Sequence, residues 1–137
     1  MAATIDALRQ VPLFKGLPDP ALRQILEIGK EVPHAGGSPV LEEDRGGVGF
    51  HLILSGTAMV TVGGAEVARF GPGDYFGEMS IIDGRPRSAT VTALEDLTTL
   101  AITAWDFEGL MEQHPSMMRA LLVELSGRIR LIEHTRS

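Results

Sequence analysis

The 137-residue sequence predicts an α+β fold in which a roll of short antiparallel strands lies between N-terminal and C-terminal helices. Three observations support this. Apolar residues in the first thirty positions recur at helical spacing, and helical spacing returns after residue 103. Between them, residues 31–102 alternate short β-like runs with turns that contain glycine. Many short strands at regular spacing are typical of a small barrel or jelly roll.

The N-terminal part, residues 1–30, is expected to be helical. Ile5, Leu8 and Val11 share one helical face. Asp19 followed by Pro20 is a typical helix start, because proline is well tolerated at the first helical position. The helix that begins there carries its apolar stripe at Ala21, Leu22, Ile25, Leu26 and Ile28 and is expected to run to Lys30.

The central part, residues 31–102, is expected to form the roll. The β-like runs cover residues 40–41, 50–54, 58–62, 65–70, 87–94 and 97–102. Gly63-Gly64 stands at a hairpin position, and residues 71–74 form a further turn.

The C-terminal part, residues 103–137, is expected to return to helix. Thr103 and Asp106 have the spacing of a helix cap, and His114-Pro115 interrupts the pattern before a second helix from about Ser116. An apolar seam suited to a partner helix then follows in steps of four and three residues, at Met118, Leu122, Leu125, Ile129 and Ile132. Because such a seam can pair with the same seam of a second chain, homodimerisation stays an alternative.

Composition narrows the class of protein. The size fits one domain over residues 1–137, and 44% hydrophobic with 22% charged residues is ordinary for a soluble globular protein. No apolar stretch reaches the roughly 20 residues of a spanning helix, and no secretory signal opens the chain. Zero cysteines fit a reducing compartment, so a cytoplasmic location is predicted. The net charge of −6 argues against nucleic acid as the main partner.

The segment from Phe76 to Val91 carries the chemistry. It combines a glycine, a carboxylate, a short apolar run, a tight turn, an arginine and a hydroxyl. Glycine lets a backbone approach a ligand closely, and the planar guanidinium of Arg87 can donate to two phosphate oxygens. These groups suit a cyclic phosphodiester on a sugar.

The segment resembles the phosphate-binding cassette of cyclic nucleotide-binding domains, as in protein kinase A regulatory subunits, cyclic nucleotide-gated channels and bacterial catabolite activator proteins. The family form, Phe-Gly-Glu followed by Pro-Arg-Ser/Ala-Ala-Thr-Val, is met at nearly every position. The resemblance implies an eight-stranded antiparallel β-roll (jelly roll), flanked by N-terminal and C-terminal helices, with a short helix in the cassette. One departure is the run of residues 41–49, in which the usual glycine followed by an acidic residue is not met, and this run is expected to be a mobile connector.

The resemblance also implies the roles of the site residues. Glu78 would accept from the ribose 2′-hydroxyl, although it could also be a helix-start glutamate. Gly77 and the backbone N–H groups of Ser88 and Ala89 would complete the phosphate pocket around Arg87. Met79 and Ser80 line the short helix, and Ser80 could simply cap it.

Two further groups of residues have alternative roles. Val60, Val67 and Phe70 align with the apolar wall for the sugar and base, but ordinary core packing explains them equally well. The last helix closes over the base in this family, which puts Leu131, Ile132 and Glu133 nearest the base, with Arg128 as another candidate. Gly127 lowers the stability of that helix by about 1 kcal/mol relative to alanine and could let it bend.

The expected function is that of a sensor or regulatory domain that binds a cyclic nucleotide and signals by moving its C-terminal helix. Resemblance to bacterial members favours cAMP, while cGMP stays possible because Ser88 could meet the guanine amino group. The sequence contains no winged helix, kinase domain or channel pore, so the signal is expected to pass to an effector protein or domain that it does not identify.

The main alternative is a nucleotide-free interaction or dimerisation module. A metal-dependent oxygenase on a similar roll is disfavoured, because the four histidines (His34, His51, His114 and His134) show no ligand spacing. Ser88 has no base partner visible in the cassette, so nucleophilic catalysis has no support, and neither an enzyme nor a metal site is predicted.

Overall fold

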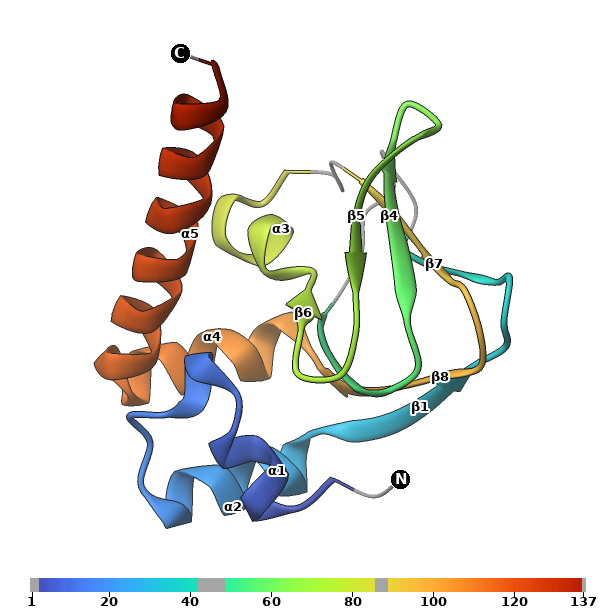
Figure 1. The fold of residues 1–137 in the computed structure, drawn as a ribbon. Helices are drawn as coiled ribbons and strands as arrows, with labels where there is room; N and C mark the ends of the chain where they lie inside the picture. The colour runs from blue at the N-terminus through green and yellow to red at the C-terminus, as the bar shows by residue number, and fades with distance from the viewer. Residues whose placement is uncertain (1–2, 42–48, 86–88, 137) are drawn as a thin grey trace.

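The computed structural model describes residues 3–41, 49–85 and 89–136, without the side chains of residues 131, 132 and 134–136. The helices gather on one side of a β-roll, and the long C-terminal helix stands beside it (Figure 1). Residues 42–48 of the expected connector (41–49) lie outside the described residues, as do Arg87 and Ser88.

The N-terminal helices form where they were predicted, with a change at each end of the last one. They are α1 (Ile5–Arg9), a short 3₁₀ helix η1 (Pro12–Phe14) and α2 (Asp19–Ile28). Asp19 was expected to cap α2, but it is the first helical residue and Pro20 the second, and no side chain in the described part of the chain caps the start of this helix. The chain leaves α2 at Gly29, which is extended, so Lys30 opens a strand instead of closing the helix. Gly29 passes close to the last strand of the roll, where a Cβ would lie 2.8 Å from the side chain of Leu100.

In the described part of the chain, eight antiparallel strands make two four-stranded sheets, which confirms the predicted roll. The first sheet has the order β1 (Lys30–His34), β8 (Leu97–Ile102), β3 (Phe50–Ser55) and β6 (Tyr75–Phe76). The second has the order β2 (Pro39–Leu41), β7 (Thr90–Ala93), β4 (Ala58–Val62) and β5 (Ala65–Phe70).

Three strands of the first sheet, β3, β6 and β8, contribute buried side chains on both faces, which divides the core in two. One face meets the helices through Phe50, Leu52, Tyr75, Leu100 and Ile102. The other face closes the inside of the roll, where Ile53, Phe76 and Leu97 pack against Val60 and Val91. Because side chains alternate along a strand, Tyr75 points toward the helices while its neighbour Phe76 points into the roll.

The C-terminal helices are α4 (Ala104–Gln113) and α5 (Pro115–Arg136). The predicted cap is present: the Thr103 hydroxyl accepts from the Asp106 N–H at 3.1 Å. The buried face of α5 carries Met117 and Leu121.

The predicted seam of α5 lies mostly on its other face. Met118, Leu122 and Ile129 are 42%, 62% and 56% exposed, and only Leu125 packs partly against the core. Those three residues of the seam therefore do not cover the roll. The side chain of Ile132 lies outside the described part of the chain.

Candidate functional site

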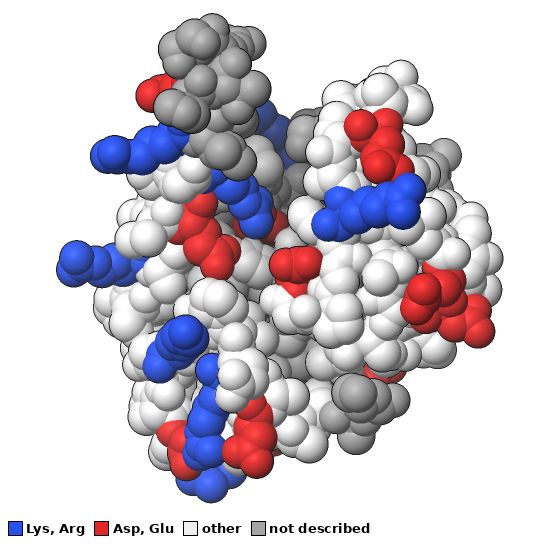
Figure 2. Space-filling view, in the orientation of Figure 1, with Lys and Arg blue, Asp and Glu red and all other residues white. Residues whose placement is uncertain are grey.

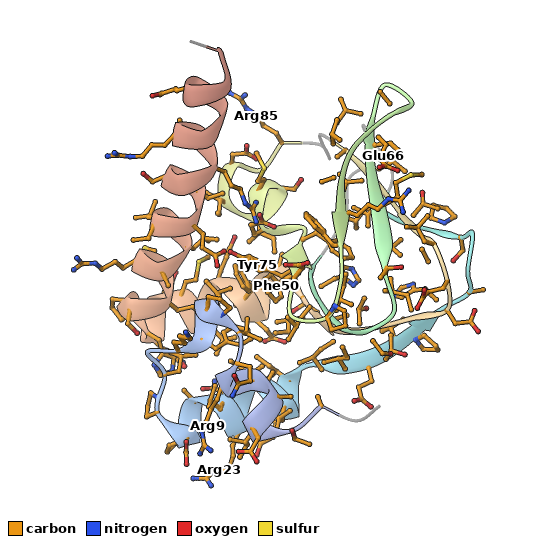
Figure 3. The ribbon with its side chains drawn as sticks, in the orientation of Figure 1. Arg9, Arg23, Phe50, Glu66, Tyr75 and Arg85 are labelled. Carbon is orange, nitrogen blue, oxygen red and sulfur yellow. The ribbon has the colours of Figure 1, made fainter. Side chains whose placement is uncertain are left out.

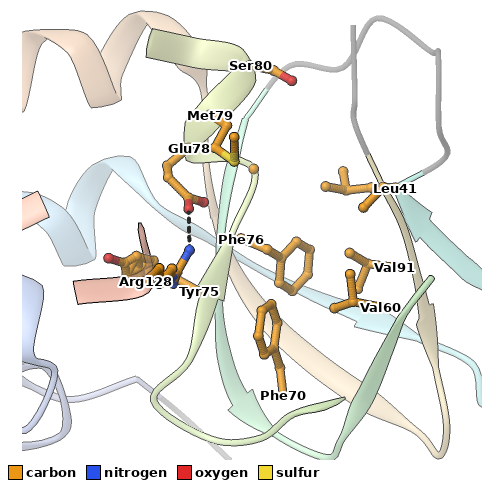
Figure 4. Close-up of a pocket in the computed structure, with 12 residues that line it drawn as sticks. Leu41, Val60, Phe70, Tyr75, Phe76, Glu78, Met79, Ser80, Val91 and Arg128 are labelled. Atoms are coloured by element: carbon orange, nitrogen blue, oxygen red, sulfur yellow. Dashed lines mark hydrogen bonds and ion pairs between the residues drawn. The ribbon is translucent and has the colours of Figure 1, made fainter. Parts of the chain in front are cut away.

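A cavity of about 170 Å³ opens where the roll, the cassette and α5 meet. Its walls come from the strands β2, β4, β5, β6 and β7, from the short helix α3 (Glu78–Asp83) and from α5 (Figure 4). The lining residues are Leu41, Val60, Phe70, Tyr75, Phe76, Gly77, Glu78, Met79, Ser80, Ala89, Val91 and Arg128.

Gly77 turns the chain from β6 into α3, the short helix expected in the cassette. Its φ of 96° lies in the left-handed region, where a Cβ is disfavoured. The turn brings Glu78 to the first position of α3 and buries its side chain against the pocket. The glycine of the cassette therefore has a structural task, namely to place the neighbouring carboxylate.

Glu78 is a buried carboxylate with a cationic partner. It is only 3% exposed, and its Oε1 atom accepts from Nη1 of Arg128 at 3.2 Å. A buried charge is costly unless it is paired, and Arg128 supplies that pairing. The other carboxylate oxygen, Oε2, accepts no hydrogen bond from the part of the chain that the structure describes, so the carboxylate keeps acceptor capacity toward the pocket.

Arg128 reaches the pocket from α5 and contacts a second group. Its guanidinium carbon lies 5.9 Å from the centroid of the Tyr75 ring, within the range of a cation–π contact. The Tyr75 hydroxyl in turn donates to Glu124, one helical turn before Arg128. Figure 2 shows acidic and basic side chains meeting in the hollow between α5 and the roll.

The pKa of Glu124 is shifted by the burial of its side chain and by the neighbouring charges. Burial raises the pKa of the Glu124 carboxyl above its ordinary value, Arg128 opposes the rise, and Asp74 adds to it.

The remaining wall of the pocket is apolar. Val60 and Val91 face it from β4 and β7, and the rings of Phe70 and Phe76 stand 6.4 Å apart between centroids and nearly parallel. His51 stacks behind Phe76 at 5.2 Å. A nonpolar wall opposite a carboxylate and a turn of backbone suits a ligand with one flat apolar face and one polar edge.

Most predicted site residues that the structure describes meet in this one pocket. Gly77, Glu78, Met79, Ser80 and Ala89 line it from the cassette. Val60, Phe70 and Arg128 line it from elsewhere. Leu131 and Ile132 lie on α5, but their side chains fall outside the description. Glu133 is exposed.

Val67 requires a correction. It is 59% exposed, lies outside the pocket lining, and does not pack in the core either. Val67 and Phe70 are three residues apart, and a strand with a period of two turns such a pair to opposite faces. Phe70 and Ala68 face the interior, which leaves Val67 in solvent beside a register irregularity between β4 and β5.

Four lining residues were not predicted as site residues: Leu41, Tyr75, Phe76 and Val91. Phe76 and Val91 are the first and last residues of the quoted cassette, so their inclusion followed from the segment itself. Tyr75 immediately precedes it and could have been found from the alternation of faces. Leu41 comes from a strand 35 positions before Phe76 in the chain, and no local signal ties it to the pocket.

Comparison with known proteins agrees with this fold. A family model described as Cyclic nucleotide-binding domain matches residues 31–114, more than half of the chain. The cyclic AMP receptor protein of Thermus thermophilus is 32% identical over 124 residues, 87% of this chain. The regulatory subunit of cAMP-dependent protein kinase from Aspergillus niger is 30% identical over 114 residues, 82% of this chain.

A solved structure gives the same result. The catabolite activator protein of Thermus thermophilus matches with a TM-score of 0.81 and 31% identity, over 90% of this chain and 61% of that one. The eight-stranded roll with its cassette defines a cyclic nucleotide-binding module, and this chain belongs to the cyclic nucleotide-binding domain family. It spans 57% of the length of the Thermus receptor and 28% of the Aspergillus subunit.

Proposed function

We propose that this chain is a sensor domain that binds a cyclic purine nucleotide, cAMP, in the pocket beside α5. The observation that carries the proposal is Glu78, a carboxylate 3% exposed, paired with Arg128, in an otherwise largely apolar pocket. Such a group suits a sugar hydroxyl, which donates one hydrogen bond to the carboxylate and brings no charge of its own. The phosphate is assigned to Arg87 with the Ser88 and Ala89 backbone, an assignment supported by the cassette sequence alone.

The choice of cAMP over cGMP has narrower support. Two relatives, the Thermus receptor and the Aspergillus subunit, carry cyclic AMP in their names. The base would lie between the apolar wall and α5, where Leu131 and Ile132 are proposed to cover it. The affinity ratio of the two nucleotides has to be measured directly.

Signalling is proposed to pass through α5. This helix contributes Arg128 to the pocket from a position 50 residues away from Glu78 in the chain. A ligand that needs a correctly held Glu78 binds better when α5 is docked, so binding shifts the population toward the docked state. The effector that detects this helix would be a protein or domain of unknown identity.

The testing experiment is calorimetric titration of the purified protein with cAMP and cGMP, and with 5′-AMP as the open-phosphate control. We expect saturable binding of a cyclic nucleotide and none of 5′-AMP. Arg87→Ala should weaken binding by several kcal/mol, because a charge-assisted bidentate contact is lost. The exposed Arg85→Ala, two residues away, is the matched control and should bind as the parent does.

Two results would contradict the proposal. Unchanged affinity in Arg87→Ala would remove the phosphate assignment. The absence of heat with either cyclic nucleotide would favour a second function, a protein-interaction or dimerisation module.

The exposed seam of Met118, Leu122 and Ile129 favours that second function. Analytical ultracentrifugation of the parent and of Leu122→Glu tests it, because a homodimer formed through the seam would sediment faster in the parent than in the variant.

The proposal includes no catalysis of its own and no metal. Within residues 3–41, 49–85 and 89–136, no group of three or more His, Cys, Asp or Glu side chains is placed to hold a metal ion. Over the same residues, no helix is both long and apolar enough to cross a bilayer. A cytoplasmic location stays a prediction from the sequence.

A further inference from the structure

Four side chains join the cassette to α5 in a crossed arrangement. Tyr75 and Glu78 come from one short segment, and Glu124 and Arg128 stand four residues apart on α5, which places them on one face of that helix. The Tyr75 hydroxyl donates to Glu124, while Arg128 donates to Glu78 at 3.2 Å. Arg128 also lies over the Tyr75 ring.

The hydrogen bond between Tyr75 and Glu124 starts from a side chain that is firmly packed. Tyr75 is buried, and its ring centroid lies 5.3 Å from that of Phe50, which itself stacks on Phe107 of α4 at 4.5 Å. Figure 3 shows Tyr75 and Phe50 side by side between the helices and the roll. A hydroxyl on such a ring has little freedom, so its hydrogen bond to Glu124 fixes how far α5 stands from β6.

The contact between Arg128 and Glu78 depends instead on a side chain that is not firmly packed. The Arg128 side chain is 47% exposed, and a long, half-exposed side chain loses rotamer entropy when it is held in one geometry. Its reach to Glu78 therefore depends on the position of the helix that carries it. The Tyr75 ring below it and Glu124 one turn earlier are the groups that limit its freedom.

We propose that Tyr75 and Glu124 are positioning residues for sugar recognition. Their hydrogen bond, here called the Tyr75–Glu124 clasp, holds α5 where Arg128 reaches Glu78 and keeps that carboxylate oriented toward the pocket. The inference rests on the proposed function, because it assigns the clasp an effect on the ribose 2′-hydroxyl. The clasp lies at a second cavity of about 260 Å³, which shares Phe70, Tyr75 and Arg128 with the first.

The test compares cAMP with 2′-deoxy-cAMP by calorimetry in a set of matched variants. Tyr75→Phe keeps the ring and removes only the hydroxyl, and Glu124→Ala removes the acceptor. Each should weaken cAMP binding about fivefold, roughly the effect of one hydrogen bond. Binding of 2′-deoxy-cAMP should change less than twofold, and the double variant should lose no more than either single one.

Two further variants separate positioning from general damage. Glu124→Gln retains a carbonyl that can accept from Tyr75, so its cAMP affinity should stay close to that of the parent. Glu108→Ala removes an exposed carboxylate of α4 and should have no effect. Equal losses for the two nucleotides, additive losses in the double variant, or unchanged cAMP affinity in Tyr75→Phe would each overturn the inference.

Hydrogen exchange of the α5 amides distinguishes failure of the clasp from failure of the proposed function. The amides around residues 120–128 should exchange faster in Tyr75→Phe and Glu124→Ala than in Glu124→Gln or the parent. If the parent binds no nucleotide, the proposed function fails, and exchange alone then decides about the clasp. Equal exchange in all variants would show that Tyr75 and Glu124 do not hold the helix.

Discussion

Glu78 is the residue on which the candidate site depends most. Its neighbour Gly77 has a φ of 96° and allows the sharp entry into α3, and the entry buries the carboxylate. The two readings of Glu78 drawn from the sequence, ligand acceptor and helix-start residue, are compatible, since it is the first residue of α3 and also lines the pocket. The partner that makes its burial tolerable, Arg128, comes from a distant helix.

Glu78→Gln should therefore change selectivity more than folding. The amide keeps the shape of the side chain but accepts a weaker hydrogen bond than a carboxylate, so cAMP affinity should fall about tenfold or more. Affinity for 2′-deoxy-cAMP should fall much less, because that ligand has no hydroxyl to lose. Competition binding with the two nucleotides measures this, and a parent protein indifferent to the 2′-hydroxyl would count against the role of Glu78.

At the scale of elements, α5 has two faces with different tasks. Met117 and Leu121 are buried against the core, whereas Met118 and Leu122, one residue further along, are exposed. The seam predicted from the sequence has a real apolar pattern, but the helix is rotated so that most of this pattern faces outward. The helix therefore docks through one stripe and presents another.

Adjacent leucines on α5 provide a direct check of this rotation. Leu121→Ala should lower the free energy of unfolding by about 2–4 kcal/mol, since it removes a side chain that is 2% exposed. Leu122→Ala should change it by no more than about 0.5 kcal/mol. Urea unfolding of both variants against the parent gives the comparison, and similar losses in the two would mean that the helix is docked differently.

At the scale of the whole molecule, the roll brings together groups that are far apart in the chain. Thr99 on β8 is fully buried, and its hydroxyl oxygen lies 3.1 Å from a ring nitrogen of each of two histidines. These nitrogens are Nε2 of His34 on β1 and Nδ1 of His51 on β3. Their rings are 6.0 Å apart between centroids. The spacing of these two histidines along the sequence does not predict that they lie close together, because β1 and β3 become neighbours of β8 only in the folded sheet.

This cluster predicts a pH dependence of folding. Burial lowers the pKa of His34 from its ordinary value of 6.5, so the unfolded chain takes up a proton more readily than the folded one. The contribution to stability is present above pH 6.5 and is lost as the pH falls through the lower pKa of the folded protein. Replacement of His34 by Gln, which cannot titrate, should flatten this part of the profile in chemical denaturation between pH 7.5 and about 5. A parallel profile in the variant would mean that other groups cause the acid sensitivity.

Local patterns were sufficient for much of this structure. The cap at Thr103 and the start of α2 near Asp19-Pro20 depend on residues within a few positions of one another, so the sequence predicts them directly. The short helix of the cassette was expected from the family resemblance of residues 76–91. Two strands were not predicted. β1 contains Pro33 and no clear alternation, and β6 is two residues long. Each exists because a partner strand supplies its hydrogen bonds, and partners are a property of the folded sheet.

By itself, the sequence determined the fold class and the segment from Phe76 to Val91 that defines the family, because both depend on short-range periodicity and on fixed offsets between neighbouring residues. The tertiary structure decided which face of each element is used. It put Val67 in solvent, turned most of the α5 seam outward, and brought Arg128 to Glu78 and Tyr75 to Glu124. These outcomes depend on the relative rotation and separation of elements that are distant in the chain, and packing of the whole core sets those quantities.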